Sequence, residues 1–183
     1  MSREQRIFHG RYGFTILAVF LSLFSTSSGT AEERVEMDDG AVSMELADGW
    51  SETDLNAGDV IAGFATQDNR NSMFLTHFEA GGSMTDIMLG TVENFEERFE
   101  ITREEKEKTG QVNGPGEKKW PAVFKSFEAE MKREEKIFPL KFYLLVFDTS
   151  EGLYLIQAST TLPVRQSRER QILEMIRSVV ANP

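Results

Sequence analysis

The sequence contains no cysteine and only two histidines among its 183 residues. The absence of cysteine excludes disulfide bonds, thiol catalysis, thiolate metal ligands and a lipid-modified cysteine. One histidine, His9, belongs to an N-terminal segment with targeting features, which leaves His77 alone in the remainder. A zinc site normally has three or four nitrogen or sulfur ligands, and a single histidine cannot supply them. We therefore expect no metal, and no other cofactor is expected.

The chain also lacks an apolar run of membrane-spanning length. The run at 14–24 (FTILAVFLSLF) has eleven residues, whereas a membrane-spanning helix needs roughly 20. It follows three arginines and precedes the small residues of 25–31, an order typical of a secretory signal peptide. Gly29 and Ala31 stand at the −3 and −1 positions of a cut before Glu32. We therefore expect a cleaved signal peptide at 1–31 and a periplasmic or secreted protein without a stable membrane anchor.

Positive charge is scarce, with 20 lysines and arginines against 30 acids and a net charge of −10. Cleavage before Glu32 removes three arginines and one glutamate, so the net charge becomes −12. Such a surface repels phosphate backbones, and nucleic acid is not an expected partner. The acidic segment 32–40 (EERVEMDDG) has few apolar residues and is predicted to be a flexible tether. The rest, 41–183, has the size of one domain.

Alternating apolar residues predict a domain rich in strands. Asp48-Gly49 favours a hairpin turn between a strand at 41–46 and one that begins at Trp50. Segment 102–109 is either an exposed edge strand or a loop. Further strands are expected at 60–66, 72–79, 117–131, 137–147 and 153–162. The last two are apolar on both faces, which is typical of central strands covered on both sides.

Two helices complete the pattern. Ser83 and Asp86 have the spacing of a capping box, and an apolar stripe of Met88, Val92, Phe95 and Phe99 follows them. The second helix is predicted over 164–180, after Pro163. Because strands run in consecutive antiparallel blocks, the fold class is α+β.

The mature chain resembles the PsbP-like superfamily, which includes many exported bacterial proteins. The resemblance rests on 44–50 (MELADGW), on the entry from Gly114-Pro115-Gly116 to Trp120-Pro121-Ala122, and on the closing strand and helix that end at 176–179. It implies a central antiparallel sheet covered by helices on both faces. It also implies a binding, chaperone or accessory role rather than an enzyme, and it carries over no functional residue.

Catalytic patterns are weak in this sequence. His77, Ser83 and Asp86 lie close enough for a nucleophilic triad, but Ser83 already has a capping role and no Gly-x-Ser-x-Gly motif surrounds it. We interpret His77 as structural. The segment 68–71 begins like a calcium loop, but Arg70 stands at its third position and the motif is better explained as a turn.

The best candidate site is a basic turn on this acidic chain. Lys118, Lys119 and Trp120 combine positive charge with a large aromatic ring and could contact a protein partner in the envelope or outside the cell. The alternative is that Trp120, like Trp50, closes an open end of the core. We expect a non-catalytic binding or accessory protein. A carrier of an apolar small molecule, or a hydrolase whose acidic residues the sequence does not locate, are the alternatives.

Overall fold

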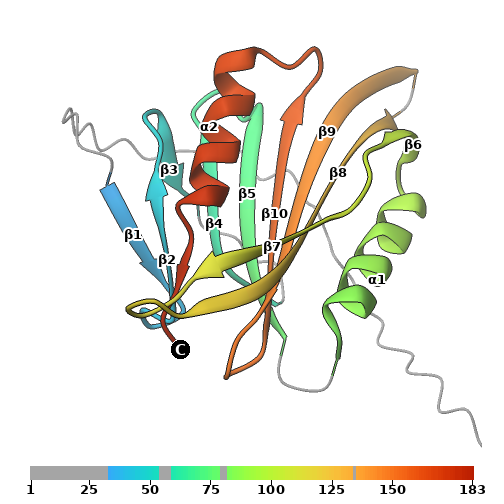
Figure 1. The fold of residues 1–183 in the computed structure, drawn as a ribbon. Helices are drawn as coiled ribbons and strands as arrows, with labels where there is room; N and C mark the ends of the chain where they lie inside the picture. The colour runs from blue at the N-terminus through green and yellow to red at the C-terminus, as the bar shows by residue number, and fades with distance from the viewer. Residues whose placement is uncertain (1–32, 54–58, 79–81, 134) are drawn as a thin grey trace, which may run out of the picture.

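The computed structural model describes residues 33–53, 59–78, 82–133 and 135–183 (Figure 1). The predicted signal peptide at 1–31 lies outside the described residues. The described chain forms strands β1 (Glu33–Met37), β2 (Val42–Leu46), β3 (Trp50–Glu52), β4 (Val60–Thr66), β5 (Asn71–Phe78), β6 (Glu100–Glu104), β7 (Lys108–Asn113), β8 (Lys119–Arg133), β9 (Lys136–Asp148), β10 (Leu153–Thr161) and β11 (Val180–Ala181). The helices are α1 (Met84–Glu96) and α2 (Gln166–Arg177).

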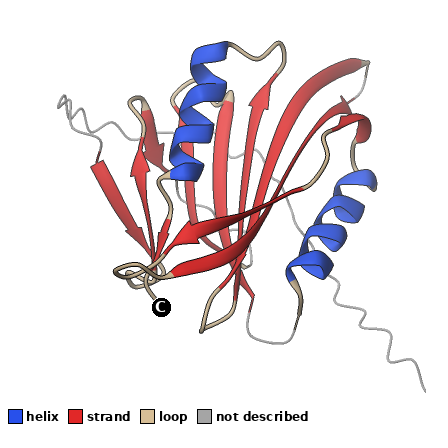
Figure 2. Ribbon diagram, in the orientation of Figure 1, coloured by secondary structure: helices blue, strands red, loops and turns tan. Residues whose placement is uncertain are grey.

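All the strands belong to one curled sheet, which forms a half-barrel (Figure 2). Its order is β1-β2-β11-β7-β8-β9-β10-β5-β4-β3, and β6 pairs with β8 beside this path. Neighbours are antiparallel except β11 and β7, which pair in parallel through Val180 and Asn113. The α+β class is confirmed, but the sheet is mixed rather than purely antiparallel.

The predicted hairpin around Asp48-Gly49 is wrong. Gly49 has a φ of 81°, and the Trp50 amide donates to the Ala47 carbonyl, so the chain does turn here. However, β1 and β11 already occupy the two edges of β2, and β3 pairs with β4 at the far end of the sheet. The turn is therefore a corner between the two ends of the half-barrel.

The predicted tether at 32–40 is also wrong for the residues that the structure describes. Glu33–Met37 form β1, which pairs with β2 over five residues, and Met37 is buried. Asp38 follows in a turn and accepts a hydrogen bond of 2.7 Å from the Tyr154 hydroxyl. The alternation of Val35 and Met37 toward the core was concealed by the acidic residues around them.

Helix α1 confirms the predicted capping box. The Ser83 hydroxyl accepts from the Asp86 amide at 3.1 Å, and the Asp86 carboxylate accepts from the Ser83 amide at 3.3 Å. The buried stripe of α1 packs on one side of the central strands, in a cluster that includes Phe142, Leu144 and Val146 of β9. This is the convex face of the curled sheet in Figure 1.

Helix α2 lies across the open side of the curl. Its buried residues Ile172, Met175 and Ile176 join the second cluster, which contains Tyr143 and Leu145 from the other face of β9. The two helices thus cover opposite faces of the central strands. The predicted helix to residue 180 is too long, because α2 ends at Arg177 and Val180–Ala181 pair between β2 and β7.

Candidate functional site

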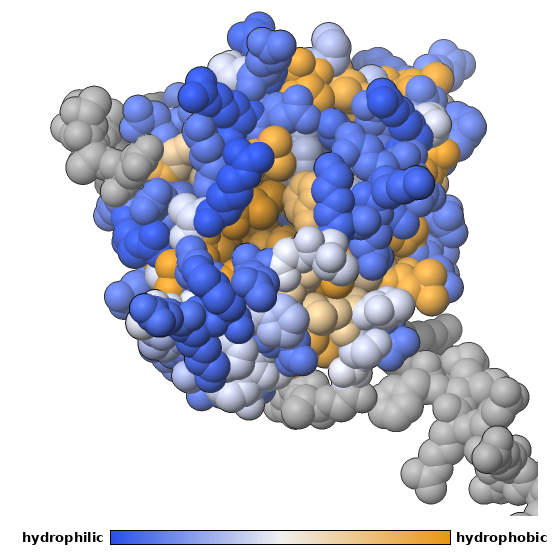
Figure 3. Space-filling model, viewed as in Figure 1, coloured by the Kyte–Doolittle hydropathy of each residue, from blue (hydrophilic) through white to orange (hydrophobic). Residues whose placement is uncertain are grey.

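The open side of the half-barrel contains a groove of about 370 Å³ between α2 and β7, over β8 and β9. Its apolar lining consists of Val112, Ala122, Phe124, Leu145, Leu173 and Ile176. Figure 3 shows this face hollowed, with apolar residues exposed in the hollow between hydrophilic ones. The groove combines concave shape, apolar surface and charged groups, as ligand sites usually do.

A compact cluster of polar side chains closes one end of the groove. Lys141 of β9 lies 2.8 Å from the Glu169 carboxylate of α2 and 3.5 Å from Glu105. The Tyr143 hydroxyl donates to the same Glu169 oxygen at 3.0 Å. Because Lys141 and Tyr143 alternate with apolar residues along a buried strand, one face of β9 carries this cluster into the groove.

Burial and charge set the ionisation of this cluster. The hydrogen bond from Lys141, with a further one from Tyr143, holds the pKa of Glu169 below its ordinary value, although partial burial opposes this. Burial alone would lower the pKa of Lys141, but Glu169 and Glu105 outweigh it and raise that pKa. Burial and the charge of Glu169 raise the pKa of the Tyr143 hydroxyl. At neutral pH Lys141 is therefore an ammonium, Glu169 a carboxylate and Tyr143 a neutral phenol.

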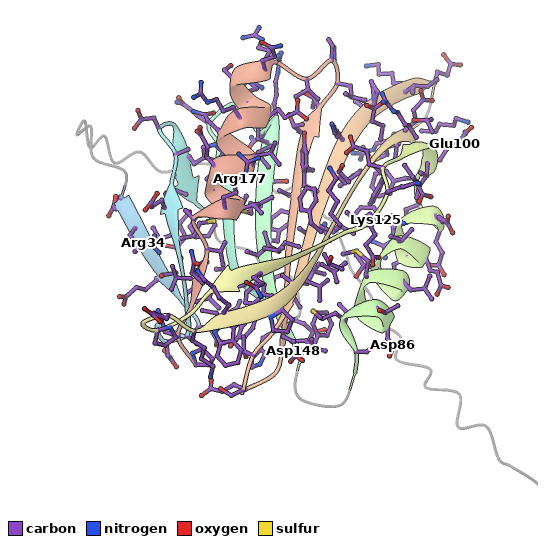
Figure 4. All side chains as sticks on the ribbon, viewed as in Figure 1. Arg34, Asp86, Glu100, Lys125, Asp148 and Arg177 are labelled. Atoms are coloured by element: carbon purple, nitrogen blue, oxygen red, sulfur yellow. The ribbon has the colours of Figure 1, made fainter. Side chains whose placement is uncertain are left out.

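The groove differs in charge from the rest of the chain. Its ionisable lining residues are Glu105, Lys108, Lys141, Glu169 and Arg177, which give a net charge of +1 on a chain of −10. Lys108 lies 3.9 Å from Glu105, so both acids have cationic neighbours. Arg177, on α2 in Figure 4, lies at the groove without an ion pair to any residue in the described ranges. The groove therefore favours an anionic group near Arg177.

Replacing Glu169 with glutamine is expected to lower the free energy of unfolding by about 1–2 kcal/mol at pH 7, because Lys141 and Tyr143 lose a charged acceptor. The folded-state pKa of Glu169 lies below its ordinary value of 4.5, so its contribution is present above pH 4.5 and is lost as the pH falls below it. The difference in the free energy of unfolding between the unmodified protein and Glu169→Gln should therefore be smaller at pH 3 than at pH 7, as measured by urea unfolding.

Glu174→Gln is the matched control for that substitution. Glu174 also lies on α2, but its side chain is 55% exposed and pairs, among the described residues, only with Arg170 one turn away. Such exposed pairs contribute little to stability, so this variant should unfold like the unmodified protein at both pH values. Equal effects of the two substitutions at pH 7 would contradict the role assigned to Glu169.

The basic turn predicted as a partner site is organised differently from the sequence-based expectation. Trp120 is 8% exposed and belongs to the core, and its indole N–H donates to the Ala181 carbonyl at 3.0 Å. Lys118 and Lys119 are exposed, with the Lys118 ammonium 3.6 Å from the centroid of the Trp120 ring. The ring is therefore not available as a docking surface, as the alternative interpretation held. Partner contact by the two lysines stays a prediction.

Gly114 explains how the indole reaches the core. A Cβ atom at Gly114 would stand 2.6 Å from the Trp120 indole nitrogen, closer than non-bonded atoms approach. The absence of a side chain at Gly114 thus makes room for the buried indole of Trp120.

The interactions of His77 among the described residues are with Tyr154, Asp38 and the Glu151 carbonyl, not with Ser83. Its ring stacks on Tyr154 with centroids 4.4 Å apart, and its Nδ1 lies 3.4 Å from an Asp38 carboxylate oxygen. These contacts tie the turn after β1 to β5 and β10, which agrees with the structural interpretation of His77. Among the described residues, no group of three or more histidine, aspartate or glutamate side chains could hold a metal ion.

The segment 68–71 is a turn, as predicted. The Asp68 carboxylate accepts from the Thr66 hydroxyl at 2.7 Å and contacts Arg168 of α2. The Thr66 hydrogen bond, together with Arg168 and the Arg70 amide, lowers the pKa of Asp68 to about 2, although burial opposes this. Asp68 thus links the β4–β5 turn to the first turn of α2.

Within the described ranges, neither helix is long and apolar enough to cross a membrane.

Comparison with known proteins identifies the fold. No family model matches the sequence, and no curated protein matches it. Among solved structures, the chain is similar to cyanobacterial PsbP (CyanoP) from Synechocystis sp. PCC 6803, at 12% identity over 86% of this chain and 98% of that one, with a TM-score of 0.55. The chain has the Mog1/PsbP-like fold.

Two further structures share the Mog1/PsbP-like fold. LpqN, involved in cell envelope biogenesis of Mycobacterium tuberculosis, matches at 8% identity over 82% of this chain and 90% of that one, with a TM-score of 0.55. The Ran-binding protein Mog1p of Saccharomyces cerevisiae matches at 10% identity over 80% and 93%, with a TM-score of 0.50. This chain also spans 46% of a longer Bacteroides thetaiotaomicron protein, at 14% identity and a TM-score of 0.49.

Sequence reasoning missed the groove and its polar cluster. One signal was present: Lys141 is the only charged residue inside the apolar segment 137–147 (IFPLKFYLLVF). A charge within a strand that is otherwise buried on both faces needs a partner. The partner, Glu169, comes from a helix 28 residues later, and no local pattern connects the two.

Proposed function

We propose that the protein is an exported, non-catalytic binding or accessory protein whose partner occupies the groove between β7 and α2. The observation that carries the proposal is the groove, which is already open in the isolated chain and joins an apolar floor to a charged end. The signal-peptide pattern at 1–31 supports action in the periplasm or outside the cell. The Mog1/PsbP-like fold supports binding by analogy with a Ran-binding protein and a protein of cell envelope biogenesis.

The charges at the groove argue against hydrolysis by its acids. A glycosidase needs one carboxyl group whose pKa is raised so that it can donate a proton. The pKa of Glu169 is lowered instead, and the Lys141 ammonium lies 2.8 Å from Glu169 and 3.5 Å from Glu105. Transport of an apolar small molecule is the second candidate, because a volume of about 370 Å³ lies within the range of small-molecule sites.

The function can be tested by filling the groove. A Cβ atom at Gly110 of β7 would meet no atom within 4 Å, so Gly110→Phe can place a ring in the groove without displacing the strand. Gly90 on α1 is equally open and lies away from the groove, which makes Gly90→Phe a matched control. The unmodified protein and both variants would be expressed as full chains in the native host cell. Each would carry a photo-crosslinking residue in place of Leu173, which lines the groove.

We expect the exported product to begin at or near Glu32 by N-terminal sequencing. A defined crosslinked species should form with the unmodified protein and with Gly90→Phe, and most of it should be lost with Gly110→Phe. A species that persists with Gly110→Phe, or a product that keeps residues 14–24 in the membrane, would contradict the proposal.

A further inference from the structure

The edge of β7 that borders the groove is free over most of its length. On one side β7 pairs with β8 along all six residues. On the other side, within the described chain, it meets only β11, through the single pair of Asn113 and Val180. Lys108–Gln111 are exposed, and a side chain at Gly110 would meet open space. An open edge of this kind is a template for another strand.

The register of β7 and β8 shows which backbone groups point outward. The Gly114 amide donates to the Lys118 carbonyl at 2.9 Å, so Gly114 and Lys118 form a hydrogen-bonded pair. Because hydrogen-bonded and non-hydrogen-bonded pairs alternate, Gln111 and Pro121 form a non-hydrogen-bonded pair. Pro121 has no N–H, which agrees with this assignment. The N–H and C=O groups of Thr109 and Gln111 therefore point away from β8, toward α2.

We propose that this edge accepts an extended polypeptide segment of a partner as an additional strand. The proposal rests on the proposed function, and it specifies the occupant of the same groove. Two observations favour a strand. Asn113, which has the same outward orientation, already pairs with β11, so an added strand would continue an interface that the chain itself uses. The groove also lies directly beside the outward groups of Thr109 and Gln111.

The residues that line the groove indicate which side chains that segment should carry. Apolar side chains at alternate positions of the added strand would enter the recess lined by Phe124, Leu173 and Ile176. An acidic side chain would lie next to Arg177, because the lining has a net charge of +1 and Arg177 forms no ion pair among the described residues. Backbone pairing with β7 would supply the affinity. The apolar recess and Arg177 would supply the selectivity for particular side chains of the segment.

Proline and alanine at position 111 separate strand pairing from side-chain contact. Gln111→Pro removes an outward N–H without removing a hydrogen bond to β8, whereas Gln111→Ala keeps the N–H and shortens the side chain. Circular dichroism and urea unfolding would establish that both variants fold. The probe is a phage-displayed library of random linear peptides, selected on the unmodified mature protein and counter-selected on Gly110→Phe.

We expect the selected peptides to alternate apolar residues and to contain aspartate or glutamate. A synthetic peptide of the consensus should bind Gln111→Ala as it binds the unmodified protein, and Gln111→Pro about tenfold more weakly, the effect of one or two backbone hydrogen bonds. Arg177→Gln should abolish the preference for the acidic residue. In the unmodified protein, hydrogen exchange at the Thr109 and Gln111 amides should become slow when the peptide binds, which tests the pairing without any substitution.

Several results would overturn the inference. These are failure to select groove-dependent peptides, equal binding by the proline and alanine variants, and amides of Thr109 and Gln111 that exchange as fast with saturating peptide as without it. Concentration-dependent dimers that Gln111→Pro abolishes would make a second copy the occupant. If the in-cell crosslink at Leu173 is lost with Gly110→Phe but not with Gln111→Pro, the binding function stands and strand pairing is wrong.

Discussion

Replacing Trp120 with alanine is expected to lower the free energy of unfolding by about 3–5 kcal/mol, the range for large aromatic side chains truncated in a core. Trp120 is 8% exposed and packs in the cluster inside the half-barrel. Its indole N–H also donates to the Ala181 carbonyl of β11, which would lose this partner. Urea unfolding followed by circular dichroism measures the effect.

The two tryptophans provide a matched comparison. Trp50 is similarly buried at 6%, but its indole nitrogen has no hydrogen-bond partner among the described residues. Trp120→Phe should therefore cost about 1–2 kcal/mol more than Trp50→Phe, because only Trp120→Phe leaves a buried carbonyl without its donor. A loss below about 1 kcal/mol for Trp120→Ala would place the ring at the surface and restore it as a docking residue beside Lys118 and Lys119.

Replacing Phe142 with alanine is expected to cost about 3–5 kcal/mol, since its ring is the centre of the aromatic cluster under α1. The centroid of Phe142 lies 4.5 Å from that of Phe95, and 5.3 Å from those of Phe99 and Phe127. Such contacts between rings add to the free energy of burying the apolar area. Truncation would leave a cavity between α1 and β9.

Two other positions of β9 complete this experiment. Leu145 is 6% exposed and faces the groove and α2, so Leu145→Ala should cost about 2–5 kcal/mol and test the other face. Ile137 is 57% exposed, and Ile137→Ala should change stability by less than about 0.5 kcal/mol. If Phe142→Ala and Leu145→Ala do not both lower the free energy of unfolding clearly more than Ile137→Ala does, β9 is not a central strand covered on two faces.

Local patterns in the sequence were sufficient wherever the structure depends on neighbouring residues. The capping box of Ser83 and Asp86, the turn at 68–71 and the antiparallel pair β9–β10 are all set by short-range hydrogen bonds or by alternation. Apolar residues on both faces of 137–147 predicted a covered central strand, and α1 and α2 do pack on its two sides. These features need only the geometry of helices, strands and turns.

Most of the failed predictions concern contacts between segments that are distant in the sequence. The turn at Asp48-Gly49 has hairpin chemistry, but β1 and β11 already pair with β2, so β3 is directed to β4. The exception is the acidic segment at 33–37, which pairs with the next strand, β2, across a short turn. Val180 leaves the predicted helix because it pairs with Ser43 of β2 and Asn113 of β7 in the sheet.

The sequence by itself determined the α+β class, the acidic charge, the targeting pattern and the local elements, because each depends on composition or on residues a few positions apart. Only the tertiary structure decided where the sheet closes, that Trp120 is buried, and that a groove lies between α2 and the free edge of β7. The groove joins Glu105, Lys141, Glu169 and Arg177 from segments far apart in the chain. Their proximity results from the curl of the whole sheet, and no periodicity within one segment records that curl.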